Sequence, residues 1–306
     1  MNSLWRPAAS DGSPQPASGQ AGPAGPVPMH SKAARRDNGR FELDFLRDGK
    51  RTTVGRQFVS YPFHMTRPFR LDTAIPSLLT VYQQSSSGGL YRGDKLSSSY
   101  SAGRLAAAHV TTQAATVVHD CYGEPACQTT SITLAEDSFL ALTPDPLVLF
   151  PGAACEFAVD ARLEAGAVLM LSDAFAMHDP QGLSRPFARL RSDIGVRDGA
   201  GRLMVRDCIE VEGNALSGPA SPMGHWRLIA NILIVGEVAR LPDLPALEAL
   251  RASSGAIFGI TQLPNAAGWG LRCLASEAIS IRRLCDALFS TVVRAAFGHA
   301  PAKRRK

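Results

Sequence analysis

The sequence lacks several patterns that would place it in a common functional class. Its six cysteines are dispersed and form no C-x-x-C pair, which indicates reduced thiols rather than a disulfide framework. No G-x-S-x-G segment marks a nucleophilic serine. The longest apolar run, residues 228–236, is far too short to span a bilayer. The first 35 residues contain no apolar segment of a signal peptide. We therefore expect a soluble, cytoplasmic protein.

Charge is scarce and unevenly placed. Charged residues make up 19% of the 306 residues and hydrophobic residues 45%, so a sizeable core can form. The formal net charge is +5, yet residues 272–306 alone have eight basic and two acidic residues. The rest of the chain is close to neutral, unlike a protein that binds duplex nucleic acid over its whole surface. We interpret the basic end as a solvated tail, although it could also meet nucleic acid, an anionic membrane or an acidic partner.

Three regions differ in composition. Residues 1–37 are rich in Pro, Gly, Ala and Ser and cannot bury enough apolar surface to offset the entropy lost on ordering. From Gly39, apolar and polar residues alternate around an Asp48-Gly49 turn signal, which is typical of two strands joined by a turn. We predict a disordered leader at 1–37, a single β-rich domain at 38–300 and a basic tail at 301–306.

A weak internal repeat fills the middle of the chain. Three short turns, at about residues 103, 137 and 166, are each followed by an apolar stretch that is compatible with a strand. Because one such unit cannot bury its own apolar face, neighbouring units stack on one another. We predict a mainly β fold, in which many strands form a helical, stacked, β-solenoid-like arrangement.

Two segments favour α-helices. Residues 241–254 have leucines at helical spacing after a proline, and residues 276–298 give the clearest helical pattern. In the second segment we expect Ser276 to cap the start and Gly298 to end the helix. Its predicted apolar face consists of Ile279, Leu284, Leu288, Val292 and Ala295.

The stretch Ser-Ser-Ser-Gly-Gly-Leu-Tyr-Arg-Gly-Asp-Lys at 85–95 has the glycine spacing of a phosphate-binding loop. Such a loop needs a lysine directly after the last glycine, to reach the phosphates. Asp94 stands at that position, and its carboxylate would repel a phosphate. We therefore predict a glycine-rich turn between strands, where Gly88, Gly89 and Gly93 permit positive φ.

Two groups of residues could meet a metal ion. His119, Cys121 and Cys127 lie within nine residues, but their spacing matches no standard zinc template, so we interpret them as parts of a surface loop. Asp145, Glu156 and Asp173 lie beside apolar strands, with His178 shortly after. Most carboxylates of this kind are solvated turn groups. If these carboxylates line one internal passage, they would suit a hard or borderline divalent cation.

Several segments occur in an order that is specific in combination. G-G-x-x-x-G-D lies at 88–94, T-T-Q-A-x-T at 111–116 and P-x-P-x-x-x-F at 144–150, between the opening strands and the C-terminal helix. Together, over about residues 39–300, they resemble the UreD (also called UreH) family of urease accessory proteins. The segment 173–190 departs from the family pattern, because Asp173 stands where that family commonly has a Glu.

The resemblance implies a maturation chaperone and not an enzyme. Such a protein acts with UreF-like and UreG-like partners to deliver Ni²⁺ to apo-urease, without a tightly bound cofactor, nucleic acid or membrane. It implies an internal passage where Asp94 and Asp173 ligate nickel transiently. Further passage or motif residues are Gly88, Gly89, Gly93, Thr112, Gln113 and Asp145.

Two other functions remain open from the residues alone. The chain could be a β-solenoid hydrolase or lyase that acts on an acidic polymer, with Asp94, Asp145 and Asp173 as acid or base groups. Such an enzyme needs its carboxylates about 5–10 Å apart in an open groove. The chain could instead be a nucleic-acid-binding module that uses the basic residues 303–306.

Overall fold

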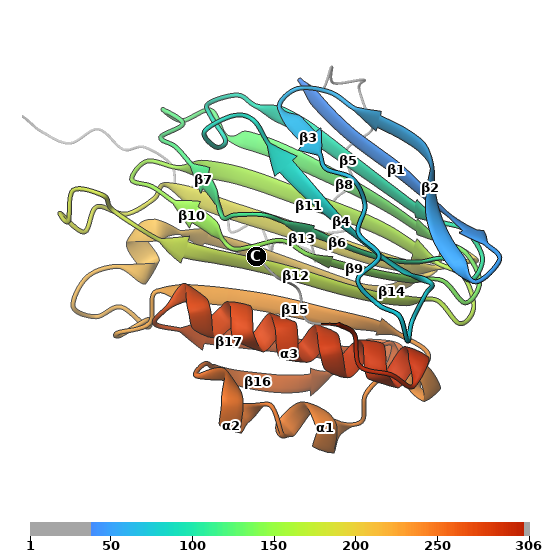
Figure 1. Ribbon diagram of the computed structural model, residues 1–306. Coiled ribbons are helices and arrows are strands. Elements are labelled where there is room, and N and C mark those ends of the chain that lie inside the picture. The colour runs from blue at the N-terminus through green and yellow to red at the C-terminus, as the bar shows by residue number, and fades with distance from the viewer. Residues whose placement is uncertain (1–37, 303–306) are drawn as a thin grey trace, which may run out of the picture. The chain divides into compact units, whose positions relative to one another are not determined.

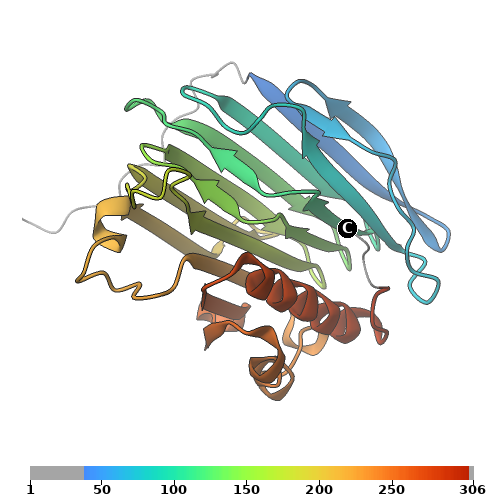
Figure 2. The same ribbon diagram turned by 60° about the vertical axis from the view of Figure 1, so that its left-hand side comes forward.

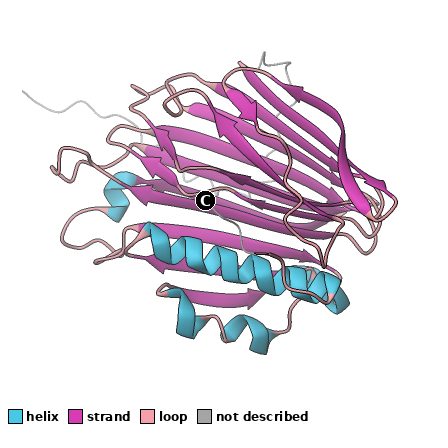
Figure 3. Cartoon of the chain, viewed as in Figure 1, coloured by secondary structure: helices cyan, strands magenta, loops and turns pink. Residues whose placement is uncertain are grey.

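We describe residues 38–302 of a computed structural model, in which strands dominate and helices cover one side (Figures 1 and 3). The leader predicted at 1–37 and the last four residues of the predicted basic tail lie outside the described residues. The strands form two sheets. The seven-strand sheet contains, in spatial order, β14 (Leu203–Glu212), β13 (Arg189–Asp198), β11 (Ala154–Leu163), β8 (Ala126–Leu134), β5 (Lys95–Ala102), β1 (Gly39–Asp48) and β2 (Arg51–Val59).

The second sheet has ten strands. Its main path runs through β16 (Ile257–Gln262), β17 (Gly268–Ala275), β15 (Leu228–Gly236), β12 (Val168–Met177), β9 (Phe139–Thr143), β6 (Ala107–Thr112), β4 (Leu78–Ser85) and β3 (Phe63–Met65). Two short strands, β10 (Leu147–Leu149) and β7 (Thr116–Val118), extend it beside β12.

Successive coils of the chain alternate between the two sheets, as the repeat predicts. The strand pairs β5–β6, β8–β9 and β11–β12 each contribute one strand to each sheet, and equivalent strands pair in parallel. Each pair is joined by a four-residue turn, at 103–106, 135–138 and 164–167, closed by a backbone hydrogen bond of 2.9–3.2 Å. Neighbouring turns also bond to each other, from Leu105 N–H to the Glu136 carbonyl and from Asp137 N–H to the Ala165 carbonyl. The prediction of stacked, solenoid-like strands is confirmed.

The third residue of each turn has a left-handed backbone conformation. This conformation explains why the sequence shows short turns at about residues 103, 137 and 166. Leu105, Asp137 and Gly166 have φ of 61°, 56° and 66°. A left-handed residue at this position lets the chain reverse within four residues. The strands β5, β8 and β11 of the seven-strand sheet therefore each lead directly into a strand of the ten-strand sheet, and the space between the sheets is enclosed coil by coil.

The main core lies between the two sheets, where several strands of the seven-strand sheet, such as β5 and β13, turn alternate residues inward. Along β5 every second residue is buried, which is the pattern of a strand with one face on a core. Phe41 and Phe45 of β1 and Tyr100 of β5 belong to this core, together with Leu79, Val110 and Leu169 of the opposite sheet. Burial of such side chains provides the main driving force for the two-layer arrangement.

The outer face of the ten-strand sheet is covered by α3 (Ala278–Phe297), as Figures 1 and 2 show. The helix ends at Gly298, which has φ of 76°, as predicted. Its N-cap is Glu277, not the predicted Ser276. The buried positions include Ile281 instead of the predicted Ile279, because the helix is rotated slightly relative to the face that the apolar pattern indicated.

The segment predicted as one helix at 241–254 contains two short ones, α1 (Leu244–Glu248) and α2 (Arg251–Ser254). Asp243 caps α1 by accepting a hydrogen bond from the Ala246 N–H at 2.9 Å. Three 3-10 turns complete the described elements: η1 (Gly213–Leu216), η2 (Val238–Arg240) and η3 (Pro264–Ala266). Among residues 38–302, no helix is long and apolar enough to cross a bilayer.

Candidate functional site

The space between the sheets changes from apolar to polar along the strands. In β8 the inward-facing residues run from Ala126 through Gln128 and Thr130 to Ile132 and Leu134. The first of these joins a small apolar cluster at one end, and the last two join the main core. The polar residues between them face a cavity of about 780 Å³. The cavity is therefore a gap between two apolar clusters, and inward-facing polar side chains line it.

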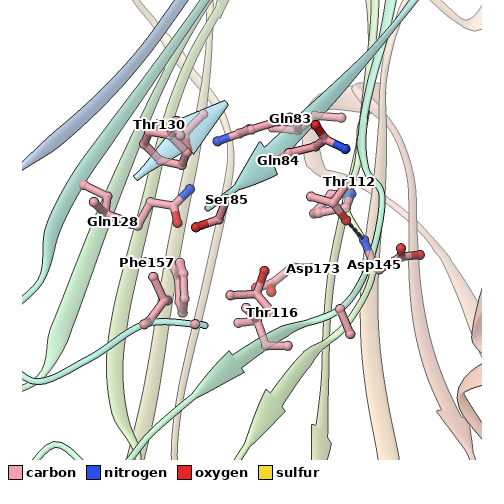
Figure 4. A pocket seen from close by; sticks show the side chains of 18 of the residues that line it. Gln83, Gln84, Ser85, Thr112, Thr116, Gln128, Thr130, Asp145, Phe157 and Asp173 are labelled. Atoms are coloured by element: carbon pink, nitrogen blue, oxygen red, sulfur yellow. Dashed lines mark hydrogen bonds between the residues drawn. The ribbon is translucent and has the colours of Figure 1, made fainter. Parts of the chain in front are cut away.

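Both sheets contribute to the cavity wall. The register of the seven-strand sheet aligns Leu96, Gln128, Phe157 and Ser192 in one row, because β5, β8, β11 and β13 pair in parallel. In Figure 4 the side chains of Gln128, Thr130 and Phe157 come from this sheet. The opposite wall consists of residues of β4, β6, β7 and β12 and of the segments that follow β6 and β9. Its polar members include Gln83, Gln84, Ser85, Thr112, Gln113, Thr116, Asp145 and Asp173.

Asp173 is the carboxylate that lies most deeply within the walls. It belongs to β12, and its register partner on β15 is Asn231, which in turn pairs with Arg272 on β17. Burial raises the pKa of the Asp173 carboxyl, a hydrogen bond from Ser192 offsets part of this effect, and the Asp207 carboxylate adds to it. The Arg272 guanidinium acts in the opposite direction. Asp173 is thus a carboxyl that binds a proton more tightly than an exposed aspartate does.

A polar contact closes the wall beside Asp173. Arg272 forms an ion pair with Asp207 of β14, with Nη1 donating to Oδ2 at 3.2 Å. The Asn231 amide donates a hydrogen bond to the same carboxylate. Because β14 belongs to the seven-strand sheet and the other two residues to the ten-strand sheet, this group of residues joins the sheets at one edge.

Asp145 lies at the edge of the cavity. It follows β9, and its backbone N–H donates to Thr112 Oγ1 at 2.8 Å, which positions the two segments relative to each other (Figure 4). The predicted pair Thr112 and Gln113 therefore both line the cavity, and Gln113 accepts a hydrogen bond from the amide of Gln84. That these two residues line or brace a passage for an ion stays a prediction.

The glycine segment occupies a loop between β4 and β5. Gly88 and Gly89 line the cavity, and Gly89 has φ of 146°, a conformation that side chains strongly disfavour. A Cβ atom on Gly89 would lie 2.3 Å from the Val117 carbonyl oxygen, so the backbone can approach this closely only at a glycine. Gly93 has φ of 71°. The predicted glycine-rich turn is present, with positive φ at Gly89 and Gly93 but not at Gly88.

Asp94 lies outside the residues that line this cavity. Its carboxylate accepts a hydrogen bond from the Tyr91 N–H at 2.8 Å, and its own N–H donates to the Tyr91 carbonyl at 3.1 Å. The side chain therefore closes a turn at 91–94. The structure brings Asp145 and Asp173 to one cavity and places Gly93 and Asp94 in the adjoining turn. Nickel ligation by Asp94 and Asp173 remains a prediction.

The thiols near this region are mostly enclosed. Cys121 and Cys155 are buried and Cys127 is half-buried. Burial raises the pKa of the Cys155 thiol, and the nearby Asp173 carboxylate raises it further. Between residues 38 and 302, no three His, Cys, Asp or Glu side chains converge in a way that could hold a metal ion.

The sequence analysis missed several residues of the cavity wall. Gln83, Gln128, Thr130 and Ser192 lie inside strands and carry no recognisable motif. A signal does exist in the alternation of inward- and outward-facing residues along the strand. Gln128 and Thr130 occupy the inward-facing positions, as the buried Ile132 and Leu134 do. A polar residue at an inward-facing position of a predicted strand would have pointed to a cavity.

These features define a class of protein, a two-layer coiled β-structure with a polar cavity between its sheets. The family model described as "UreD urease accessory protein" matches residues 37–306. The chain is 42% identical over 298 residues to "Urease accessory protein UreD 1" of Methylorubrum extorquens (strain PA1), covering 97% of this chain and 98% of the relative.

Two further relatives support the same assignment. "Urease accessory protein UreD 3" of Bradyrhizobium sp. (strain ORS 278) is 42% identical over 84% of this chain and 91% of its own length. "Urease accessory protein UreD 1" of Pseudomonas syringae pv. syringae (strain B728a) is 33% identical over 83% and 90%. The chain belongs to the UreD family of urease accessory proteins.

Proposed function

We propose that this chain is a cytoplasmic urease maturation chaperone that conducts Ni²⁺ through its internal cavity. It would act with UreF-like and UreG-like partners on apo-urease, and nickel would be its cargo, not a resident cofactor. The observation that carries the proposal is the cavity of about 780 Å³ between the sheets of a UreD-family member, with Asp173 within its wall and Asp145 at its edge.

The chemistry of the cavity wall supports transfer better than storage. Its polar groups are mainly hydroxyls, amides and two carboxylates, which are weak ligands for a hydrated divalent ion. An ion can be conducted only if each site binds it weakly enough to release it. The raised pKa of Asp173 suits this role, since a proton competes with the metal for the carboxylate.

The fold also supports a role in which the chain itself performs no reaction. The alternative enzyme needs Asp94, Asp145 and Asp173 together in an open groove, whereas Asp94 closes a turn outside the cavity.

Urease activation in cells that lack their own UreD tests this proposal. We expect the chain to restore nickel-containing urease and to co-purify with apo-urease and the UreF-like partner. Asp173→Asn should lower the nickel content of urease while co-purification persists. Asp94→Asn, at the other predicted nickel ligand, shows whether the carboxylate in the adjoining turn also contributes, since a nickel content equal to the wild type would remove Asp94 from the transfer path. A well-folded chain that binds none of the partners would contradict the proposal.

A further inference from the structure

A second cavity, of about 680 Å³, lies at one end of the strands. Its walls come from the end of β12, the 178–186 loop, the 216–228 segment and Ser276, which follows β17. The two long loops project beyond the end of β12 and the start of β15, on the left in Figure 1. The volume falls within the range of sites that hold small molecules in proteins.

The two cavities differ in the sign of their charge. The cavity between the sheets has Asp145 and Asp173 in its wall and, among the described residues that line it, no lysine or arginine. The described lining of the second cavity contains two arginines, Arg185 and Arg227, and one carboxylate, Asp179. β12 contributes residues to both walls. The first cavity therefore suits a cation, whereas the second offers positive charge.

The carboxylate of the second cavity is engaged within its own loop. Asp179 accepts hydrogen bonds from the backbone N–H groups of Gln181 and Arg185, both at 3.0 Å. The Arg185 side chain adds a fork, with Nε donating at 3.1 Å and Nη2 at 2.9 Å. The Arg185 guanidinium holds the pKa of the Asp179 carboxyl well below its usual range, so the ion pair persists at neutral pH. Asp179, whose side chain is 4% exposed, therefore repels an anion in the cavity only weakly.

The fork leaves one edge of the Arg185 guanidinium unused. A guanidinium has five N–H donors, and the contact with Asp179 occupies one on Nε and one on Nη2. Nη1 makes no hydrogen bond to any residue between 38 and 302. The edge between Nη1 and Nη2 can therefore bind a second oxyanion through two parallel hydrogen bonds. Because Asp179 already fixes the side chain, such binding costs little conformational entropy.

Arg227 is the uncompensated cation of this cavity. Its backbone is fixed at the end of the ten-strand sheet, because its N–H donates to the Ala275 carbonyl at 2.9 Å and its carbonyl accepts from the Met177 N–H at 3.2 Å. Its side chain is exposed, and in the described part of the chain no acidic side chain lies within ion-pair distance of it. Arginines such as Arg189 and Arg206 of the seven-strand sheet do have acidic partners. Arg227 thus leaves the cavity with a net positive charge.

Much of the remaining wall is apolar. Val148, Ala176, Leu216 and Leu228 line the cavity, and the exposed hydroxyl of Ser276 adds a polar group. An apolar wall favours a ligand with an apolar part, because their contact removes apolar surface from water. A few charged groups within a mainly apolar wall are typical of a site that orients one end of a small molecule.

We propose that this second cavity binds a small organic anion. Its carboxylate or phosphate group pairs with Arg227 and with the unused edge of Arg185, and its apolar part lies against Val148, Leu216 and Leu228. The site is separate from the cavity proposed to conduct nickel. The inference goes beyond the proposed function and does not depend on it, because anion binding is a property of the chain alone.

Phenyl phosphate tests the site, because it joins an oxyanion to an apolar ring. Its binding to the purified full-length chain is measured by calorimetric titration at low salt, and we expect saturation at one site. Arg227→Gln should weaken this binding about tenfold or more, since it removes a charged hydrogen-bond donor. Arg227→Lys should fall between the two, because it keeps the charge and loses the fork.

Arg282→Gln is the matched control. Arg282 is an exposed arginine of α3 that lies outside the cavity lining and has no ion pair with any described residue. This variant should bind phenyl phosphate as tightly as the wild type. Equal losses in Arg227→Gln and Arg282→Gln would show only general attraction to a basic surface and would overturn the inference.

Three further ligands separate the two parts of the proposed recognition. Inorganic phosphate lacks the apolar ring and should bind more weakly than phenyl phosphate, and benzyl alcohol lacks the charge and should not bind. Benzoate carries a carboxylate on the same ring, and the tighter of benzoate and phenyl phosphate identifies the preferred oxyanion. Benzyl alcohol that binds as tightly as phenyl phosphate, or no saturable binding of either anion at millimolar concentration, would contradict the proposal.

A second measurement locates the ligand without any variant. Phenyl phosphate added to the wild type should shift the backbone amide NMR signals of Gly182, Gly218 and Gly224, which line this cavity. The signals of Gly88 and Gly89, which line the cavity between the sheets, should stay unchanged. The reverse pattern would place the anion in the wrong cavity and overturn the inference. A chain that binds the anion here but neither binds apo-urease nor restores its nickel would contradict the proposed function alone.

Discussion

At the scale of single residues, Asp173 is the clearest case of a side chain whose charged form lowers the stability of the fold. A carboxyl in a half-apolar wall is destabilised in its charged form, and the raised pKa expresses that cost. Arg272 and Ser192 offset only part of it. A residue of this kind is expected where function requires a charge or a proton, because an uncharged side chain would fold more stably.

Replacing Asp173 with Asn should therefore stabilise the fold at neutral pH by about 1 kcal/mol. The folded-state pKa is raised, so the wild type has its full stability at low pH and loses it as the pH rises through that pKa. The difference in melting temperature between the Asp173→Asn variant and the wild-type protein should grow as the pH rises above the ordinary aspartate pKa of about 4. A difference that stays constant or shrinks as the pH rises would show that desolvation does not dominate at Asp173.

Gly89 gives a second prediction at this scale. Gly89→Ala should cost about 2–3 kcal/mol, because it combines φ of 146° with a clash against the Val117 carbonyl oxygen. Gly88→Ala is the matched control, since its new Cβ would meet only the hydroxyl end of the flexible Tyr91 side chain. Urea denaturation of both variants checks the difference. Equal costs at the two positions would mean that the close backbone approach is not what requires the glycine.

At the scale of elements, the apolar pattern of the sequence predicted where α3 lies in the chain but not which of its faces is buried. The prediction of its end at Gly298 was right and its assigned buried face was partly wrong, because several half-apolar positions share one side of the helix. Which of them face the sheet depends on the residues opposite, such as Met170 and Ile232 of the ten-strand sheet. The same limit applies to 241–254, where local spacing could not show that the helix breaks into two.

The orientation of α3 can be tested by alanine substitutions at two positions of the helix. Ile281→Ala should cost about 2–5 kcal/mol, because Ile281 is 1% exposed and its removal leaves a cavity under the helix. Ile279→Ala should cost about 1 kcal/mol or less, since Ile279 is only half-buried. Thermal or chemical denaturation gives both values. The opposite order would favour the face that the sequence pattern indicated.

At the scale of the described body, the sheets are held together by apolar burial and by few polar links. The Asp207–Arg272 pair is one such link, with side-chain exposures of 15% and 52%. Its position beside Asp173 gives it a second effect, because the guanidinium also lowers the pKa of that carboxyl. The ion pair that joins the two sheets at their edge therefore also affects the pKa of the Asp173 carboxyl in the cavity wall.

A double-mutant cycle with Asp207→Asn and Arg272→Met should give a coupling energy of about 0.5–1 kcal/mol. Partial exposure of Arg272 keeps the value small. The comparison pair Arg104–Glu136, with exposures of 66% and 62%, should couple by close to zero. A comparable coupling in the two cycles would mean that the link between the sheets is no stronger than an ordinary surface ion pair.

The sequence by itself determined the periodic parts of this protein. Turns at about 103, 137 and 166, the alternation of β5 and the end of α3 depend on neighbours within a few residues, and local backbone chemistry fixes them. The family motifs also marked the segments that line the cavity. Tertiary structure alone decided that Gln128, Ser192 and Asp173 face one space and that Asp94 closes a turn instead. Those outcomes depend on the register between strands separated by dozens of residues, which no local pattern specifies.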